Sequence, residues 1–305
     1  MVPITLKKPS VAIPAIVLLA CACVEMTPAA RQFTMLAVHT ANGFLSNLRH
    51  PGTPGLGSAV FVAVVLFLAG VVSGLAGFAF SAIAACILWL LPPLQAVPLI
   101  MLLSACNQLL SISKLRQEMV VRGNADREGA LPYIIGGIAG VPIGVELLRT
   151  LPANLFAGGL GGFLVAYALV MLLMPGTLRI DVSGPKAAAA VGALGGVVGG
   201  FSGFGASVLV VYLGLRGVGK SATRGITQPY ILTMQLVSLA VLAATDAAIF
   251  NIFFWFLWAM TLPAVLLGSS TGVALYRRLS DGNFRRAVLI LLIVSGASLV
   301  AKTVV

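Results

Sequence analysis

Residues 70–81 read GVVSGLAGFAFS, and residues 196–207 read GVVGGFSGFGAS. Seven of the twelve positions are identical, at a constant offset of 126 residues. Each copy places a glycine-rich break inside a long apolar run. In lipid, the backbone groups that such a break frees are tolerated only where they are buried in protein or line a cavity. The pair therefore predicts two broken helices around a binding site.

The composition is typical of a protein with many membrane-spanning helices. Of the 305 residues, 59% are hydrophobic and 9% are charged, whereas a soluble domain has about one quarter charged residues. The net charge of +11 is explained by basic residues that fix membrane orientation, and nucleic acid is not an expected partner. Four cysteines without paired CxxC motifs and two histidines imply no metal, no cofactor and no disulfide framework.

The repeat divides the chain into four segments. Residues 58–174 form the first transmembrane repeat, residues 187–305 the second, and residues 175–186 a cytoplasmic linker. Residues 1–57 are an N-terminal apolar segment and connector, in which residues 11–24 are either a short span or the core of a signal peptide. The repeat continues beyond its first motif, so that each half is a broken run followed by three spans. At an offset of 128, the residues Gly140, Gly144, Val145, Leu147, Arg149, Leu151 and Phe156 match Gly268, Gly272, Val273, Leu275, Arg277, Leu279 and Phe284.

Two topologies fit this pattern. Each broken run either crosses the membrane, which makes the halves parallel, or forms a re-entrant hairpin, which makes them inverted. Cytoplasmic loops collect Lys and Arg. With residues 11–24 counted as a span, the 19 basic residues divide 9 to 10 in the crossing model and 15 to 4 in the re-entrant model. The expected fold is therefore an all-α polytopic membrane protein of two inverted repeats, each a re-entrant broken-helix hairpin plus three transmembrane helices, with an extra N-terminal apolar segment.

The two hairpin tips carry groups suited to a small anion. The second half-helix of each hairpin is expected to point unpaired N–H groups and its positive dipole end at the tip. Small residues leave room for a ligand to touch the backbone, and two serines at equivalent positions add hydroxyl donors. The alternative is that the glycines serve only close helix packing. The predicted tip residues are Gly77, Phe78, Ala79, Ser81, Gly203, Phe204, Gly205 and Ser207.

Uncharged polar side chains lie in the spans that follow the hairpins. Asn107 and Gln108 belong to the first half, and Thr227 and Gln228 to the second. They suit an oxyanion without a fixed charge at depth, which would cost about 2.5–3.5 kcal/mol at a helix centre. The competing interpretation is interhelical hydrogen bonding.

A basic loop follows the second hairpin. Its Lys220 and Arg224 either anchor the membrane topology or attract anions by their field. Residues 214–221 (GLRGVGKS) also match the P-loop pattern, with residues 208–213 in the place of its strand. A P-loop needs a soluble α/β domain, and no polar stretch here is long enough for one. Nucleotide binding is therefore not expected.

The two glycine-rich openings, each followed by a polytopic segment, resemble the sulfite exporter TauE/SafE family, also called the toluene sulfonate uptake permease family. The resemblance covers roughly residues 60 to 303. It implies a bacterial inner-membrane permease for sulfur-containing oxyanions and related organic anions, such as sulfite, sulfoacetate or aryl sulfonates. The usual motif of that family has more consecutive glycines, whereas Phe78 and Phe204 occupy the tips here. Such bulky tips would favour a different or larger ligand.

The sequence thus predicts a secondary permease that moves a small anion by alternating access around the two tips. A sulfur oxyanion or organosulfonate and the lipid bilayer are its expected partners, and homo-oligomerisation is left open. The rival interpretation is a non-transporting membrane scaffold or accessory subunit. An enzyme is not expected, because the sequence offers no paired carboxylates, histidine cluster or activated nucleophile.

Overall fold

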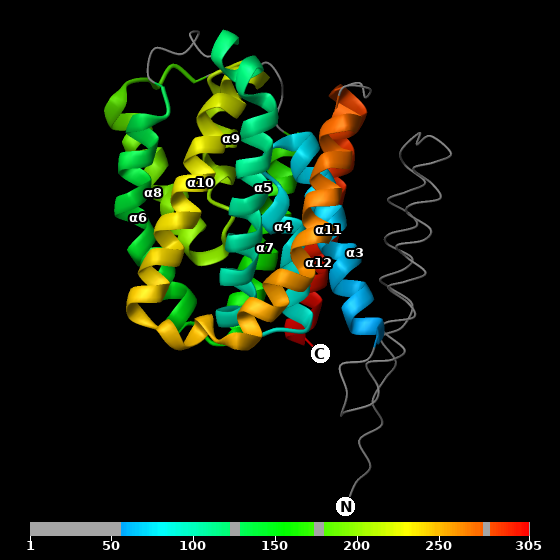
Figure 1. Ribbon diagram of the computed structural model, residues 1–305. Helices are drawn as coiled ribbons and strands as arrows, with labels where there is room; N and C mark the ends of the chain where they lie inside the picture. The colour runs from blue at the N-terminus through cyan, green and yellow to red at the C-terminus, as the bar shows by residue number, and fades with distance from the viewer. Residues whose placement is uncertain (1–55, 123–128, 174–179, 277–280, 305) are drawn as a thin grey trace, which may run out of the picture. The chain divides into compact units, whose positions relative to one another are not determined.

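The computed structural model describes residues 56–122, 129–173, 180–276 and 281–304, and residues 62–305 form one compact unit. The apolar segment at residues 11–24 lies outside the described residues. Every element of the described part is helical (Figure 1). In chain order the elements are α3 (Leu56–Ala76), α4 (Phe80–Ala84), η1 (Ala85–Trp89), α5 (Pro93–Arg122), α6 (Leu131–Thr150), α7 (Ala153–Leu173), α8 (Pro185–Ser202), α9 (Ala206–Leu215), α10 (Lys220–Thr245), η3 (Ala247–Phe250), α11 (Ile252–Tyr276) and α12 (Asp281–Val304).

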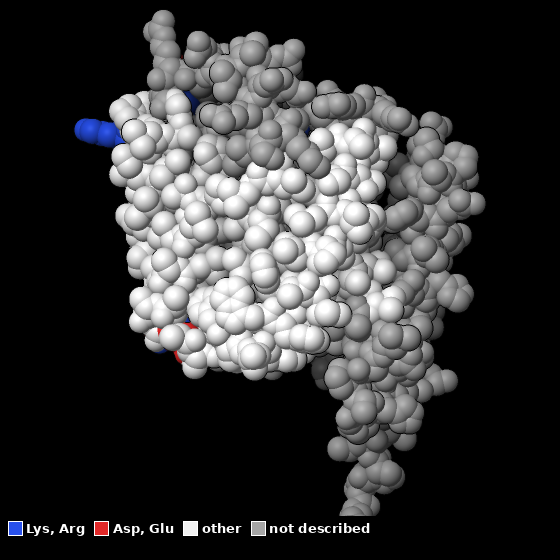
Figure 2. All heavy atoms as spheres, viewed as in Figure 1, with Lys and Arg blue, Asp and Glu red and all other residues white. Residues whose placement is uncertain are grey.

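The described helices form a polytopic membrane protein, as the sequence predicts. Among the described residues, five helices are long and apolar enough to cross a membrane, and they lie in α5, α6, α7, α10 and α11. Shorter apolar helices follow each glycine-rich break, at residues 80–89 and 206–215. On the face shown in Figure 2, the described atoms belong almost entirely to uncharged residues, and the few charged ones lie near the ends of the bundle. Such a surface suits lipid, in which charged side chains are costly.

The second glycine-rich stretch reverses the chain. α8 ends and α9 begins on either side of Gly203, whose φ is 74°. A left-handed φ is open to glycine at little steric cost, so the break falls at this residue. α9 then folds back along α8: a Cβ on Gly199 would lie 3.3 Å from Gly205 Cα, and one on Gly195 would lie 2.9 Å from Leu209 Cδ1.

The two ends of this second hairpin also meet. The Ile180 N–H donates to Leu215 O at 3.1 Å, and the Tyr212 hydroxyl donates to Val182 O at 2.8 Å. The chain therefore enters and leaves the hairpin at the same end of the bundle, the upper end in Figure 1. Residues 208–213, the strand that a P-loop would need, lie inside α9, so the match to that pattern is coincidental.

The first glycine-rich stretch breaks in the same way. Gly77 adopts a φ of 85° between α3 and α4. Before this break, α3 runs parallel to α11, since a Cβ on Gly268 would lie 2.1 Å from Phe67 O and one on Gly272 would lie 2.2 Å from Val71 O. Both numbers rise together along the two helices, which fixes their relative direction.

After the break, the chain runs parallel to α12 instead. The Ser295 hydroxyl donates to Ala82 O at 2.7 Å, and further along Lys302 Nζ donates to Leu88 O. In Figure 1, α11 runs to the upper end of the bundle and α12 returns to the lower end. The chain therefore reverses between α3 and α4, and this hairpin opens toward the end opposite to the second one.

Helices from different halves make matched contacts. A Cβ on Gly140 of α6 would lie 2.1 Å from Ala193 O of α8, and one on Gly268 of α11 would lie 2.1 Å from Phe67 O of α3. The repeat offsets of 128 and 126 convert the first contact into the second. The two-repeat arrangement remains a prediction, which these matched contacts support. Further glycines in equivalent contacts are Gly144 with Gly272, Gly196 with Gly70, and Gly200 with Gly74.

The last helices of the two halves, α7 and α12, cross in opposite directions. A Cβ on Gly161 would lie 2.6 Å from Gly296 O, and one on Gly158 would lie 3.3 Å from Thr303 Cγ2. The residue number rises along one helix as it falls along the other. Inverted halves require this opposition, whereas parallel halves would set equivalent helices parallel.

The glycines that the two copies share therefore have two structural roles. Gly77 and Gly203 make the breaks, because their φ values are left-handed. The other shared glycines let helix backbones approach closely, as small residues do in membranes. These packing glycines are Gly70, Gly74, Gly196 and Gly200.

Candidate functional site

The tips of the two hairpins touch each other. The rings of Phe78 and Phe204 stack with centroids 6.5 Å apart and an angle of 18° between their planes. The Tyr167 ring of α7 meets Phe204 edge-on, at 5.4 Å between centroids. A Cβ on Gly203 would lie 3.2 Å from Ser81 Oγ. Phe78 and Phe204, 126 positions apart in the sequence, are thus brought together.

The second tip satisfies its own polar groups. The Ser207 hydroxyl donates to Phe204 O at 2.8 Å, and the Phe204 N–H donates to Ser202 Oγ at 3.3 Å. Gly205 is small for packing, since a Cβ there would lie 2.5 Å from Gly195 O. The room that the sequence suggested for a ligand at this glycine is therefore taken by α8.

The first tip is surrounded by side-chain amides. Gln108 Nε2 donates to Gly77 O at 3.1 Å, and Asn107 Nδ2 donates to Ser73 Oγ at 2.7 Å. From α10, Gln228 Nε2 lies 3.4 Å from the position that a Cβ on Gly77 would take. Two glutamines from different halves therefore converge on one glycine. The predicted Thr227 does not join them, because its hydroxyl donates to Thr223 O in its own helix, at 2.8 Å. Ala79 caps the short α4 and is buried.

Several amide atoms beside the first tip have no hydrogen-bond partner among the described residues. They are Asn107 Oδ1, Gln108 Oε1, and both Nε2 and Oε1 of Gln228. None of the three side chains is more than 1% exposed. A buried polar group left unsatisfied costs about 1–3 kcal/mol. Interhelical hydrogen bonding therefore accounts for only one of the two polar side-chain atoms of Asn107 and of Gln108, and for neither polar side-chain atom of Gln228.

Arg224, which the sequence places in a basic loop, also lies at the first tip. Its Nη2 donates to Gly74 O at 3.1 Å and to Leu75 O at 2.7 Å, and its Nε lies 2.9 Å from the position of a Cβ on Gly77. The cation thus caps the carbonyl end of α3, where the helix dipole is negative. Its position one helical turn before Gln228 is the signal that could have found it, since residues four apart share a helix face.

No metal centre is indicated in the described part of the chain. Among the described residues, no three His, Cys, Asp or Glu side chains lie close enough together to hold a metal ion. The ion pair between Glu146 and Arg149, at 3.1 Å, lies at an exposed helix end far along the chain from either tip.

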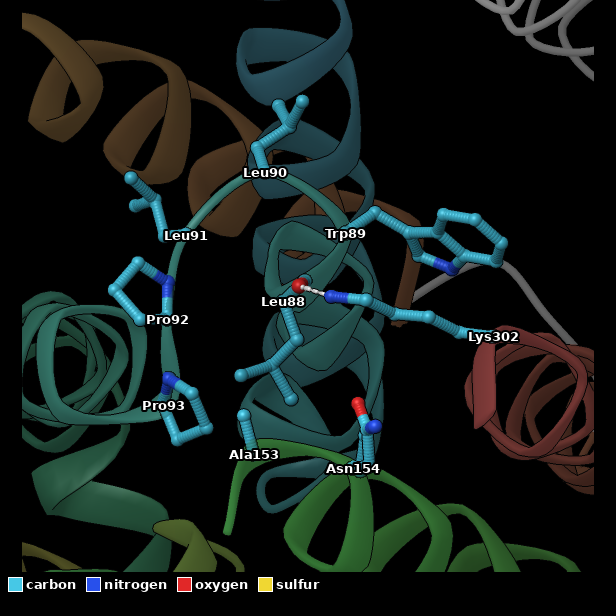
Figure 3. A pocket seen from close by; sticks show the side chains of 10 residues that line it. Leu88, Trp89, Leu90, Leu91, Pro92, Pro93, Ala153, Asn154 and Lys302 are labelled. Atoms are coloured by element: carbon cyan, nitrogen blue, oxygen red, sulfur yellow. Dashed lines mark hydrogen bonds between the residues drawn. The ribbon is translucent and has the colours of Figure 1, made fainter. Parts of the chain in front are cut away.

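A recess of about 150 Å³ lies away from the tips, where η1 ends and α5 begins (Figure 3). Trp89, Pro92 and Asn154 contribute to its walls, and Lys302 reaches into it from α12. Lys302 Nζ donates to Leu88 O and lies 5.9 Å from the centroid of the Trp89 ring. Since none of the predicted site residues lines this recess, we interpret it as the place where α12 is anchored to the end of the first hairpin.

Comparison with known proteins gives one match. The family model described as "Sulfite exporter TauE/SafE" matches residues 62–299. The searches of curated proteins and of solved structures found no match. The matched range contains both hairpins, the stacked tips and the amide cluster, and it covers well over half of the 305 residues. The chain therefore belongs to the sulfite exporter TauE/SafE family.

Proposed function

We propose that this membrane transporter is a secondary permease for a small anion, a sulfur oxyanion or organosulfonate, which binds beside the first hairpin tip. The observation that carries the proposal is Gln228, a fully buried amide with both polar atoms unpartnered among the described residues, aimed at Gly77. Arg224 supplies positive charge at the same glycine.

The donors at the first tip favour a small anion over a cation. The Arg224 guanidinium lies at this tip, where it donates to Gly74 O and Leu75 O beside Gly77. Amide N–H groups and a guanidinium are donors that recognise oxyanion oxygens. The unpartnered amide oxygens of Gln108 and Gln228 would accept from bound water or from a protonated oxyanion. An organosulfonate would add an apolar part, for which the neighbouring Phe78 ring is suited.

Alternating access gives the two hairpins their role. Inverted repeats with broken helices bind substrate where the breaks meet and rock one half against the other. The hairpins open toward opposite ends of the bundle, and their tips are in contact through Phe78 and Phe204. Separation of this aromatic pair would open a path from one end at a time. We place the end that carries most basic residues in the cytoplasm, and the protein in a bacterial inner membrane.

Loss of transport on removing the buried amide tests this proposal. We expect Gln228→Leu to raise KM for sulfite or thiosulfate in proteoliposomes at least about tenfold, the equivalent of about 1.4 kcal/mol for a lost charge-assisted hydrogen bond. Ser81→Ala combined with Ser207→Ala is expected to lower uptake less, since Ser207 is already bonded to Phe204 O. Leu236→Gln on the exposed side of α10 is the matched control.

The rival function, a non-transporting scaffold or accessory subunit, makes the opposite prediction. Proteoliposomes of the unaltered chain would then show no uptake or efflux of any sulfur oxyanion or sulfonate, and none of these anions would shift its thermal unfolding in detergent. Equal uptake by Gln228→Leu and by the unaltered chain would leave transport in place but remove the assigned site.

A further inference from the structure

We infer that the anion's route continues from the first tip along one face of α10, with Gln235 and Ser238 forming a second binding station. This inference rests on the proposed function, because it gives the permease a path. We define the α10 polar stripe as Arg224, Gln228, Gln235 and Ser238. Gln235 and Ser238 are not among the site residues predicted from the sequence.

The spacing places these four side chains on one helix face. They lie 4, 7 and 3 residues apart in α10, and residues separated by three, four or seven positions share a face of an α-helix. At a rise of 1.5 Å per residue, the stripe is about 21 Å long. It therefore spans roughly two thirds of a hydrocarbon core about 30 Å thick. Ile231, Leu239 and Leu242 add apolar side chains to the same face.

The far part of the stripe is buried and unsatisfied. Gln235 is 2% exposed and Ser238 is 0% exposed. Gln235 Nε2, Gln235 Oε1 and Ser238 Oγ all have no hydrogen-bond partner among the described residues. The same pattern marks Gln228 at the tip, one heptad earlier. Polar groups inside a membrane are conserved where they mark a substrate path, because they are costly elsewhere.

The adjacent face of α10 shows what ordinary packing looks like in this helix. The Tyr230 hydroxyl donates to Gly192 O at 2.7 Å, so this polar group is satisfied. Met234 packs on Gly137, where a Cβ would lie 2.5 Å from its Sδ, and on Gly199. These residues join α10 to α6 and α8. The stripe lies on the side of α10 that reaches the first hairpin, through Arg224 and Gln228.

The chemistry of the second station is that of a small hydrated oxyanion. A primary amide and a hydroxyl provide donors and acceptors without a fixed charge. An anion leaving Arg224 would therefore meet neutral groups that bind it weakly enough for release, as conduction through successive sites requires. A cation route would need carboxylates, and the stripe has none.

Cysteine scanning tests the route. Cys21, Cys23, Cys86 and Cys106 are first replaced by alanine, and Gln235→Cys, Ser238→Cys or Met234→Cys is then introduced singly. In membrane vesicles we expect a negatively charged methanethiosulfonate to modify positions 235 and 238 several-fold faster than 234, and an organosulfonate, which unlike sulfite does not react with the reagent, to slow both reactions. Met234 is as buried as Gln235, which makes it a matched control on the packed face.

Two results would overturn the inference: modification at 235 and 238 no faster than at 234, or modification rates that the organosulfonate leaves unchanged. Sulfite uptake by the cysteine-free parent separates this failure from failure of the proposed function. If the parent transports sulfite but positions 235 and 238 are not labelled preferentially, only the α10 polar stripe is refuted. In the unaltered background, Gln235→Leu is expected to lower the maximal rate several-fold with a smaller change in KM. Gln235→Asn, which keeps an amide, is expected to retain much of the maximal rate. Unchanged kinetics in Gln235→Leu would contradict the second station independently of the labelling.

Discussion

Replacing Gly140 or Gly268 by alanine tests whether the matched contacts between the halves hold the bundle together. In the structure, the added methyl carbon would lie 2.1 Å from Ala193 O in the first variant and 2.1 Å from Phe67 O in the second. Carbon and oxygen atoms do not approach so closely, and both obstacles are helix backbone, which cannot rotate away. Each helix pair would have to separate by about 1 Å, which loosens the dispersion contacts along it.

The magnitude follows from two opposing terms. Overpacking of this kind costs typically 1–3 kcal/mol, while alanine is favoured over glycine inside a helix by roughly 0.5–1 kcal/mol. We therefore expect each variant to lose about 1–2 kcal/mol. Gly162→Ala is the matched control, because Gly162 is exposed on α7 and a Cβ there would meet nothing within 4 Å. The control should keep or slightly raise stability.

Thermal unfolding in detergent, followed by the fluorescence of the three tryptophans, measures the effect. A loss of 1 kcal/mol lowers Tm by about 2–4 °C for a chain of a few hundred residues. Gly140→Ala and Gly268→Ala should lower Tm by similar amounts, since the repeat makes their contacts equivalent. A fall in only one of them, or an equal fall in Gly162→Ala, would refute the reasoning.

Two further predictions concern the tips. Gly77→Ala should destabilise the protein by about 1–2 kcal/mol, because alanine pays that much for a left-handed backbone and because its methyl group would press on Arg224 Nε at 2.9 Å; thermal unfolding of this variant beside Gly162→Ala measures it, and an unchanged Tm contradicts it. The stacked pair of Phe78 and Phe204 should show a coupling of about 0.5–1.5 kcal/mol in a double-mutant cycle with leucine; additive losses in the cycle would mean that the rings do not interact.

Much of this fold could be predicted because the identical positions in the repeated stretches include glycines with a geometric role. A left-handed break needs glycine, and close helix crossings need small residues, so the offsets of 126 and 128 carry real geometric information. What periodicity cannot supply is the partner of each helix. Gly140 packs on α8 of the other half rather than on a helix of its own half. This choice of partner depends on how the two halves pack together.

The candidate site was predictable in composition but not in arrangement. Gln108 and Gln228 could be singled out because amides are rare inside apolar spans. Arg224 was assigned to a loop because the span was expected to begin at Gly225, whereas α10 begins at Lys220. Five more helical residues carry the Arg224 side chain inward and onto the carbonyl end of α3. A helix start without a capping side chain leaves no local signal for this boundary.

The difference between the two tips bears on how the permease would work. The two tips differ in their contacts: Ser207 is bonded within its own tip, whereas Gln108, Gln228 and Arg224 gather at the first tip. No such cluster lies at the second tip among the described residues. Two inverted halves can open to alternate sides only if they differ at any one moment, because identical halves would open to both sides or to neither. An anion that draws Arg224 away from the α3 carbonyls would weaken the cap on the first hairpin. The anion would then bind the two states of the hairpin with different affinity, as a ligand-driven change of state requires. The asymmetry at the tips is therefore the feature through which substrate binding could be coupled to rocking of the halves.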